Sequence, residues 1–419
     1  MGVGIKARQR NARAGLFHLK TRITNQDSIL ARLNFLTDRR DSLVVIKTLF
    51  VISNFYAILN SMLSSLKRMD WVINGCFLAL AAASLLVIYN INYDNFIQQA
   101  IWFALGFLVI IVFSQVDWRP LVIHRGIIFS VYLVSIALLI ATFFFAPIIR
   151  GTRSWLVFGS IQFQTSELAK LALIILLSYY FAQRHVVIGH WQNLLIPLFY
   201  FLVPFSLILI QPDMGSALVL FSLFLGYLLI SGIHRRHLIW GVLLIALILV
   251  VSWQVVLQDY QKERVIGLFN PDYDPLGINY NTIQSKIAIG SGGWFGKGLG
   301  QGTQVQLGFL PEAATDFIFA ALTEEWGLIG ALLLIAVFSL LIWRIIKIGF
   351  LAESNFFKLI CLGTAIVFLI HFLFNVGSNV GLLPVIGMPL PLFSYGGSSL
   401  LTNAMLIGII QSIVVRFSF

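Results

Sequence analysis

The chain has 419 residues, of which 59% are hydrophobic and 11% charged, and its formal net charge is +11. Soluble domains carry about 25% charged residues, so this composition excludes a protein built around one water-facing core. The apolar runs are about 20 residues long, the length of a membrane-spanning helix, and the alternating segments of a β-barrel are absent. The sequence therefore predicts an all-α polytopic membrane protein.

Residues 1–68 differ from the rest of the chain in charge. Twelve Lys and Arg precede Asp70 against three acids, so this segment carries +9 of the net charge. We interpret it as a basic N-terminal extension, disordered or interfacial, beside anionic membrane lipids, and not as a nucleic-acid-binding arm. Met69 is an alternative start, in which case 1–68 would not be translated. The remainder, 69–419, is the predicted membrane domain.

Ten apolar runs have the length of a transmembrane helix, and no internal repeat of fixed period is visible. They are expected at 71–90, 97–115, 125–147, 167–183, 192–210, 214–233, 237–257, 316–346, 356–380 and 396–415. Lys and Arg concentrate in one alternating set of short loops, including those with Arg119 and Arg344, and the positive-inside rule makes this set cytoplasmic. A large extracytoplasmic loop, about 258–315, then lies between the seventh and eighth helices.

Asp316 stands where this loop meets the eighth span. Thr315 is a plausible N-cap, which would place Asp316 in the first helical turn. A carboxylate there is either favoured by the helix dipole alone or available as an active-site base. Glu312 and most other acids of the membrane domain also lie toward the outer side, so polar chemistry is expected on that face.

Further polar groups are candidates for the same outer site. Glu167 and Lys170 share a helix face and can pair, either as functional intramembrane charges or as a structural ion pair. Arg153 can contact phosphate or lipid headgroups. Asp213 is interpreted as the cap of the sixth span. One of the adjacent glutamates at 324–325, below Asp316 on the eighth span, is expected to pair with Lys170.

The large outer loop is rich in glycine and carries Lys286 and Lys297, which can meet phosphate oxygens. Its residue order is not that of a P-loop. It is expected to lack regular structure, which in so long a segment usually signals function. Asp272 and Asp274 are compatible with a divalent cation, Mg²⁺ or Mn²⁺, and no other cofactor or metal site is indicated.

Proline and glycine interrupt the chain between the ninth and tenth spans, where Ser394 lies. Irregular backbone at membrane depth must be buried in protein or line a cavity. We therefore expect an outward-facing cavity near Asp316, with Ser394 at its edge.

Together these motifs resemble the SEDS family of shape, elongation, division and sporulation proteins. The resemblance runs from about Asp70 to the end of the chain and rests on QSKIAIGSGG, GKG, GTQ, FLP, TDFIFA, SELAK, QPDMG and PLPLFSYGGSSLL. The IGSGG, GKG and GTQ segments are similar to the RodA-like, rod-shape-determining branch. Ala314, Thr165 and Gly308 depart from the family's usual residues, and 1–68 has no counterpart.

The resemblance implies a ten-span peptidoglycan glycosyltransferase of the bacterial inner membrane, with its active site on the extracytoplasmic face. It implies that lipid II is polymerised by inverting transfer from an undecaprenyl-pyrophosphate-linked donor, alongside a class B penicillin-binding protein that crosslinks the strands. The family's catalytic Asp falls on Asp316. The expected substrate-binding residues are Arg153, Glu167, Lys170, Lys286, Lys297, Glu312 and Ser394.

Two alternatives remain at this stage, a flippase or transporter of lipid-linked precursors and a non-catalytic scaffold of a wall-synthesis complex. Transporters usually place their sites near the midplane, on inverted repeats. The polar residues here gather on the outer face and no repeat is visible, which favours the enzyme.

Overall fold

The computed structural model describes residues 66–120, 124–149, 152–159, 161–184, 192–230, 254, 259–270, 274–277 and 279–416. Arg68–Phe419 forms one compact unit, distinct from Met1–Lys67. The predicted seventh span, 237–257, lies outside the described residues apart from residue 254, as do most of the basic extension and Asp272.

Nine of the ten predicted spans coincide with helices in the part of the chain that is described. They are α3 (Trp71–Ile91), α4 (Tyr93–Gln115), α6 (Arg125–Phe145), α7 (Thr165–Arg184), α8 (Gln192–Ile210), α9 (Met214–Ile230), α14 (Ile318–Leu351), α15 (Asn355–Asn379) and α16 (Gly397–Arg416). Seven of these are long and apolar enough to cross a membrane, and α8 and α9 contain shorter apolar helices. The chain is therefore a multi-pass membrane protein.

Short polar residues between the apolar runs begin several helices. Asp70 caps α3, Asn92 caps α4 and Ser354 caps α15, in each case by accepting backbone N–H groups of the first turn. Such caps satisfy donors that have no partner within the helix. They fix the ends of these spans near the limits of the apolar runs.

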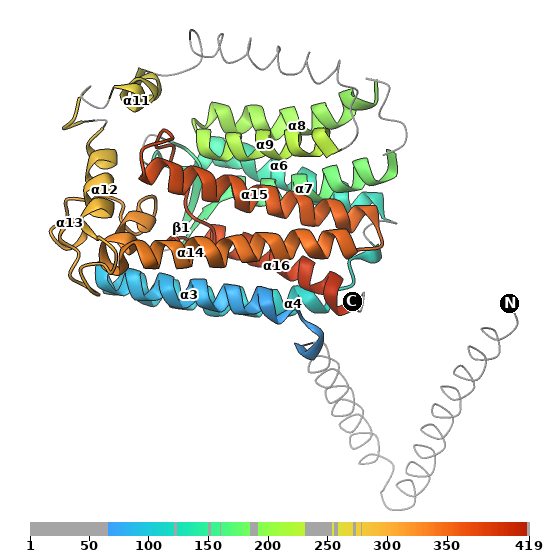
Figure 1. Ribbon diagram of the computed structural model, residues 1–419. Coiled ribbons are helices and arrows are strands. Elements are labelled where there is room, and N and C mark those ends of the chain that lie inside the picture. The colour runs from blue at the N-terminus through green and yellow to red at the C-terminus, as the bar shows by residue number, and fades with distance from the viewer. Residues whose placement is uncertain are drawn as a thin grey trace, which may run out of the picture. The chain divides into compact units, whose positions relative to one another are not determined.

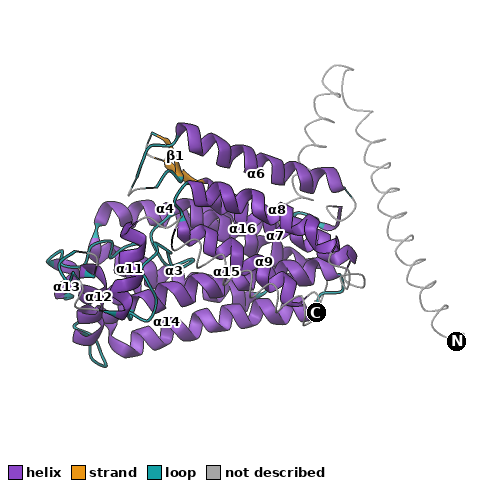
Figure 2. Ribbon diagram, turned by 90° about the horizontal axis from the view of Figure 1, so that it is seen from above, coloured by secondary structure: helices purple, strands orange, loops and turns teal. Residues whose placement is uncertain are grey.

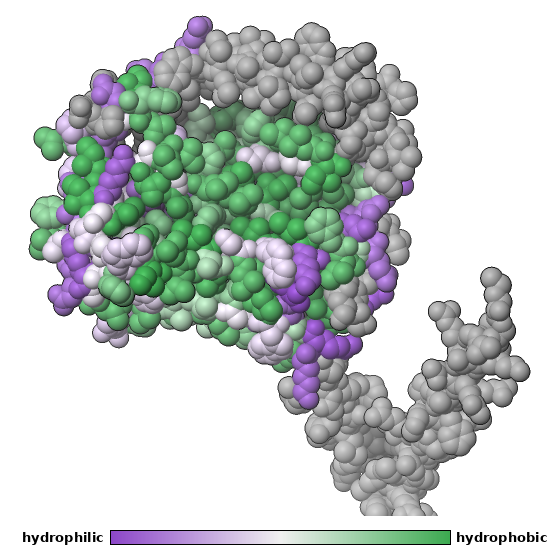
Figure 3. Space-filling model, in the orientation of Figure 1, coloured by the Kyte–Doolittle hydropathy of each residue, from purple (hydrophilic) through white to green (hydrophobic). Residues whose placement is uncertain are grey.

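The helices pack along one another, with α3, α14 and α15 running side by side (Figure 1). Figure 2 shows α6 and α14 on opposite edges of the bundle, with α7, α15 and α16 between them. The most hydrophobic stretches of α7 and α16 are 78% buried, against 22% for α4, so α7 and α16 form the centre. Hydrophobic residues cover the middle of the visible face and hydrophilic ones gather toward its ends (Figure 3), as expected for a bundle surrounded by lipid.

The expectation of an outer loop without regular structure is wrong. The segment contains α11 (Asp259–Phe269), α12 (Tyr280–Ser291) and the single turn α13 (Thr303–Gln306). α12 buries Ser285 and Ala288, and it packs mainly on α14. This tertiary contact stabilises a helix too short to be recognised from its own sequence pattern.

The segment before α7 also has regular structure. Strands β1 (Trp155–Phe158) and β2 (Ile161–Gln164) pair antiparallel, with Trp155 opposite Gln164. Gly159 begins the two-residue connection with φ of 62°, a conformation that glycine adopts without steric cost. The hairpin leads directly into α7.

The expected start of the eighth helix is also wrong. α14 begins at Ile318, Phe317 occupies its N-cap position, and 311–317 form turns. The hydroxyl of Thr315 donates to the carboxylate of Glu312 at 2.9 Å and does not cap the helix. Asp316 therefore precedes the helix, and its carbonyl oxygen accepts hydrogen bonds from side chains of α15.

Candidate active site

The main chain of Asp316 is fixed by two amides of α15. The Nδ2 atoms of Asn375 and Asn379 donate to the Asp316 carbonyl oxygen at 3.0 and 2.8 Å. The two asparagines are four residues apart and so share one face of the helix. Both are fully buried, whereas Asp316 is half-buried. Helix α15 thus fixes the main chain of Asp316 and leaves its carboxylate outside these two hydrogen bonds.

The segment between α15 and α16 clamps the residues before Asp316. Ser394 Oγ donates to the Thr315 carbonyl at 2.6 Å and accepts the Leu390 N–H at 2.8 Å. The N–H of Tyr395 donates to the Ala314 carbonyl at 2.9 Å. Ser394 is only 6% exposed. Its hydroxyl therefore holds two backbone segments together, and the sequence had suggested contact with substrate.

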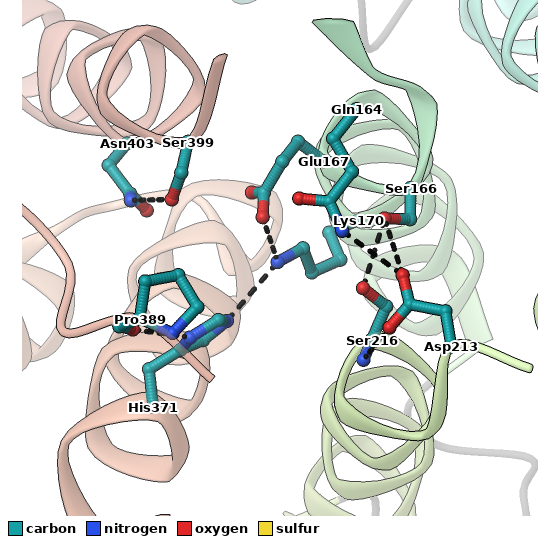
Figure 4. A network of polar contacts seen from close by, with 10 residues as sticks. All are labelled: Gln164, Ser166, Glu167, Lys170, Asp213, Ser216, His371, Pro389, Ser399 and Asn403. Carbon is teal, nitrogen blue, oxygen red and sulfur yellow. Dashed lines mark hydrogen bonds and ion pairs between the residues drawn. The ribbon is translucent and has the colours of Figure 1, made fainter. Parts of the chain in front are cut away.

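Glu167 and Lys170 form a buried ion pair, as the sequence suggested. Lys170 Nζ lies 2.7 Å from Glu167 Oε1, and the two side chains are 2% and 4% exposed. Lys170 Nζ also lies 3.1 Å from Nε2 of His371 on α15 (Figure 4). The pair lies within the bundle centre, and both printed partners of Lys170 are side chains of the protein.

Two buried glutamates of α14 bind residues 292–306 of the predicted outer loop, here called the outer segment. Glu324 Oε1 accepts from Lys297 Nζ at 2.8 Å and from the N–H of Gln304 at 2.9 Å. Glu325 accepts from Asn90 Nδ2 at 2.9 Å. The expectation that one of these glutamates pairs with Lys170 is wrong, because α3 and the outer segment, not α7, face them. Lys297 is thereby engaged in fastening this segment.

Lys286 lies close to Asn379, one of the two asparagines that hold Asp316. Its neighbour Ser285 donates to the carbonyl of Asn379 at 2.8 Å, and Asn379 holds Asp316. Lys286 is exposed and helps to line a cavity of about 50 Å³ with Asn281, Thr282 and Pro384 among others. Asp316 and Ser394 do not line it, so an outward-facing cavity near Asp316 stays a prediction.

Arg153 and Asp213 lie near the starts of α7 and α9. Arg153 is exposed, and its N–H donates to the carbonyl of Gln211 at 3.4 Å. Asp213 Oδ1 accepts the N–H of Ser216 at 3.0 Å, so the prediction that Asp213 caps α9 is confirmed. Its second oxygen accepts from Gln164 at 3.0 Å (Figure 4).

Sequence reasoning missed the residues that position Asp316. His371, Asn375 and Asn379 recur at every fourth position of an apolar span. Polar residues within a membrane helix are costly and usually face the bundle interior, so this spacing was a usable signal.

Within the described part of the chain, no group of three or more His, Cys, Asp and Glu side chains is arranged to hold a metal ion. The predicted Asp272–Asp274 cation site falls partly outside them, since Asp272 is not described. A dedicated protein cage for a cation is therefore not formed by the described side chains.

A multi-pass helical bundle with a carboxylate-bearing residue fixed at one end defines a membrane-embedded protein with a site at its surface. The family model for cell cycle proteins of the FtsW, RodA and SpoVE type matches residues 64–418. The chain belongs to this family, which confirms the resemblance to the SEDS proteins.

Individual relatives support the same assignment. The chain is 39% identical over 339 residues to the peptidoglycan glycosyltransferase MrdB of Escherichia coli K12, covering 80% of this chain and 90% of that protein. It is 30% identical to the peptidoglycan glycosyltransferase RodA of Treponema pallidum, covering 83% and 98%.

Solved structures share the fold. A chain of a peptidoglycan synthase complex that coordinates polymerization and crosslinking is similar with a TM-score of 0.71 at 27% identity, covering 84% of this chain and 98% of that one. RodA of Thermus thermophilus is similar with a TM-score of 0.63 at 26% identity, with the same coverage.

Proposed function

We infer that this chain is a peptidoglycan glycosyltransferase that polymerises lipid II into glycan strands for cell elongation and rod shape. Relatives that align along most of its length are named peptidoglycan glycosyltransferases. The observation that carries the inference within the site is the fixation of Asp316 by Asn375 and Asn379. A general base contributes only when it is held within reach of the proton that it accepts.

The proposed reaction is a single displacement with inversion. The 4-hydroxyl of the acceptor sugar attacks the anomeric carbon of the donor while the bond to undecaprenyl pyrophosphate breaks on the opposite face. Asp316 accepts the hydroxyl proton. Inversion in one step requires no covalent bond between sugar and protein, so one well-placed carboxylate is sufficient.

The leaving pyrophosphate requires positive charge. Of the four cations suggested by the sequence, Lys170 is buried against Glu167 and Lys297 is bonded to Glu324. Arg153 and Lys286 are exposed, and we assign them to the pyrophosphate. A divalent cation would need only one or two protein carboxylates, which the Asp272–Asp274 segment would supply, and it would neutralise negative charge on the pyrophosphate.

The proposal includes the setting of the enzyme. The chain has ten spans in the bacterial inner membrane, with 258–315 and the site on the extracytoplasmic face. Its partner is a class B penicillin-binding protein. The similarity to a chain of a complex that combines polymerization with crosslinking supports this partner.

The test replaces Asp316 with Asn, which keeps size and polarity but cannot accept the proton. Full-length protein, co-purified with the transpeptidase of its own organism, is incubated with lipid II, and glycan chains are separated by length. We expect normal accumulation and partner binding, with polymerisation lowered by at least about 10²-fold. A parallel assay with a chelator measures whether a divalent cation is needed.

Glycan synthesis by D316N at the parental rate would show that Asp316 is not the base. Parental protein that moves lipid II across the membrane of vesicles but forms no glycan would instead support a flippase. A parental complex that does neither would support a scaffold.

A further inference from the structure

His371 bridges two parts of the site that are distant in sequence. Its Nε2 lies 3.1 Å from Lys170 Nζ on α7, and its Nδ1 lies 3.1 Å from the carbonyl oxygen of Pro389 (Figure 4). His371 is 4% exposed and Lys170 is 1% exposed. A polar side chain so deeply buried must have its hydrogen bonds satisfied by the protein, and both ring nitrogens have partners here.

The partners determine how this imidazole is protonated. A carbonyl oxygen only accepts, so Nδ1 of His371 carries the hydrogen and donates it to Pro389. The ammonium of Lys170 only donates, so Nε2 accepts from it. Lys170 thereby donates to Glu167 and to His371 at the same time. The ring is neutral, in a single tautomer, and joins the ion pair to the segment after α15.

The same face of α15 also carries the Asp316 clamp. His371, Asn375 and Asn379 are spaced by four residues and so form one stripe along the helix. Asn375 Nδ2 donates to the carbonyl of Met388 at 2.9 Å and to that of Asp316 at 3.0 Å. One face of α15 therefore holds Lys170, the segment 388–389 and Asp316 in place.

We propose that His371 is a positioning residue, which fixes the Glu167–Lys170 pair and the segment after α15 relative to Asp316. It does not touch the reacting atoms. Removing it leaves Lys170 with one acceptor fewer and the Pro389 carbonyl without its donor. Lys170 and the segment at 388–389 then shift, while Asn375 and Asn379 still hold Asp316. The inference rests on the role proposed for Asp316, because only then does this register affect the chemical step.

The test compares H371L and H371Q in the full-length chain bound to its transpeptidase. Leucine removes both hydrogen bonds, whereas glutamine keeps one donor and one acceptor. We expect H371L to lower kcat for lipid II polymerisation by about 10- to 10²-fold, the range for a small misplacement of catalytic groups, with KM unchanged. H371Q should recover most of the loss.

A matched control separates positioning from stability. Thr364 is buried on the same helix, and its hydroxyl donates only to the carbonyl of Ile360 at 2.9 Å, within its own helix. T364V should keep the parental kcat even where it lowers the unfolding temperature. If H371L fails to accumulate, H371N replaces it, since its shorter amide reaches Pro389 but not Lys170. H371N should still show the loss of kcat.

Parental kcat in H371L, or in H371N where that variant is used, would overturn the inference. Equal losses of kcat in H371Q and H371L would also overturn it, as would a raised KM with kcat unchanged. These results are distinguishable from failure of the proposed function, because D316N is assayed beside them. An active D316N would disprove the role of Asp316 as the base. An inactive D316N beside a fully active H371L would disprove only the positioning role of His371.

Discussion

At the scale of single residues, the energetics of the centre depend on one ion pair. Lys170 and Glu167 are both almost fully buried, 2.7 Å apart. Two charges removed from water stabilise the fold little as a pair, but removing one partner leaves the other uncompensated. Neutral substitutions should therefore show strong coupling.

We expect K170M alone to destabilise the protein by about 3–5 kcal/mol. The double variant E167Q/K170M should lose clearly less than the sum of its single variants, because no isolated charge remains. Unfolding of the purified protein in detergent, followed by tryptophan fluorescence, measures the three changes. Additive losses would mean that the two side chains do not interact.

At the scale of elements, α14 depends on one glycine where its path changes. Gly327 has φ of 70° and ψ of −170°, a conformation restricted almost entirely to glycine. A Cβ atom there would collide with the backbone of Trp294 and Gly296. The N–H groups of the next two residues of α14 donate to the carbonyls of Gly293 and Trp294 at 2.9 and 3.2 Å. The kink thus docks the outer segment on the helix.

G327A should destabilise the protein by at least about 1–3 kcal/mol, the cost of a strained backbone conformation, and should release the outer segment. Protease cleavage within 292–306 and the unfolding midpoint measure the two effects. Gly75 provides the control, because it lies within helix α3 with no atom within 4 Å of an added Cβ. G75A should be neutral or slightly stabilising. Equal behaviour of the two variants would contradict the role of the kink.

At the scale of the whole molecule, the membrane unit closes on itself at the end opposite to the site. The carboxylate of Asp70 pairs with Arg344 of α14 at 2.6 Å. The backbone N–H of Asp70 donates to Gln411 Oε1 of α16 at 2.8 Å, and Gln411 Nε2 donates to the Asp70 carbonyl at 3.0 Å. Three helices are joined by residues that all follow Met69. The basic extension contributes none of these contacts.

A chain that starts at Met69 should therefore insert into the membrane, bind its transpeptidase and polymerise lipid II as the full-length chain does. Membrane fractionation and the glycan assay measure this. A truncated chain that fails to insert or to form glycan would show that 1–68 has a structural or functional role.

The limits of the described spans, and the residue on which the proposed chemistry depends, follow from local sequence patterns. In lipid each backbone polar group must be bonded within its own segment, so an apolar run of about 20 residues is necessarily a helix. The helices found within the described residues accordingly start and end near the predicted limits. Asp316 was singled out by its place at a helix entry and by its motif, both of which are local.

Only the tertiary structure decided what surrounds Asp316. Its carbonyl is held by Asn375 and Asn379, 59 and 63 residues away in the chain. Lys170 meets His371, 201 residues away, instead of a glutamate of α14. The helix after Asp316 starts later than its capping pattern suggests, and α12 forms where a loop was expected. In each case a contact between distant segments is stronger than the local preference, and no local pattern contains that contact.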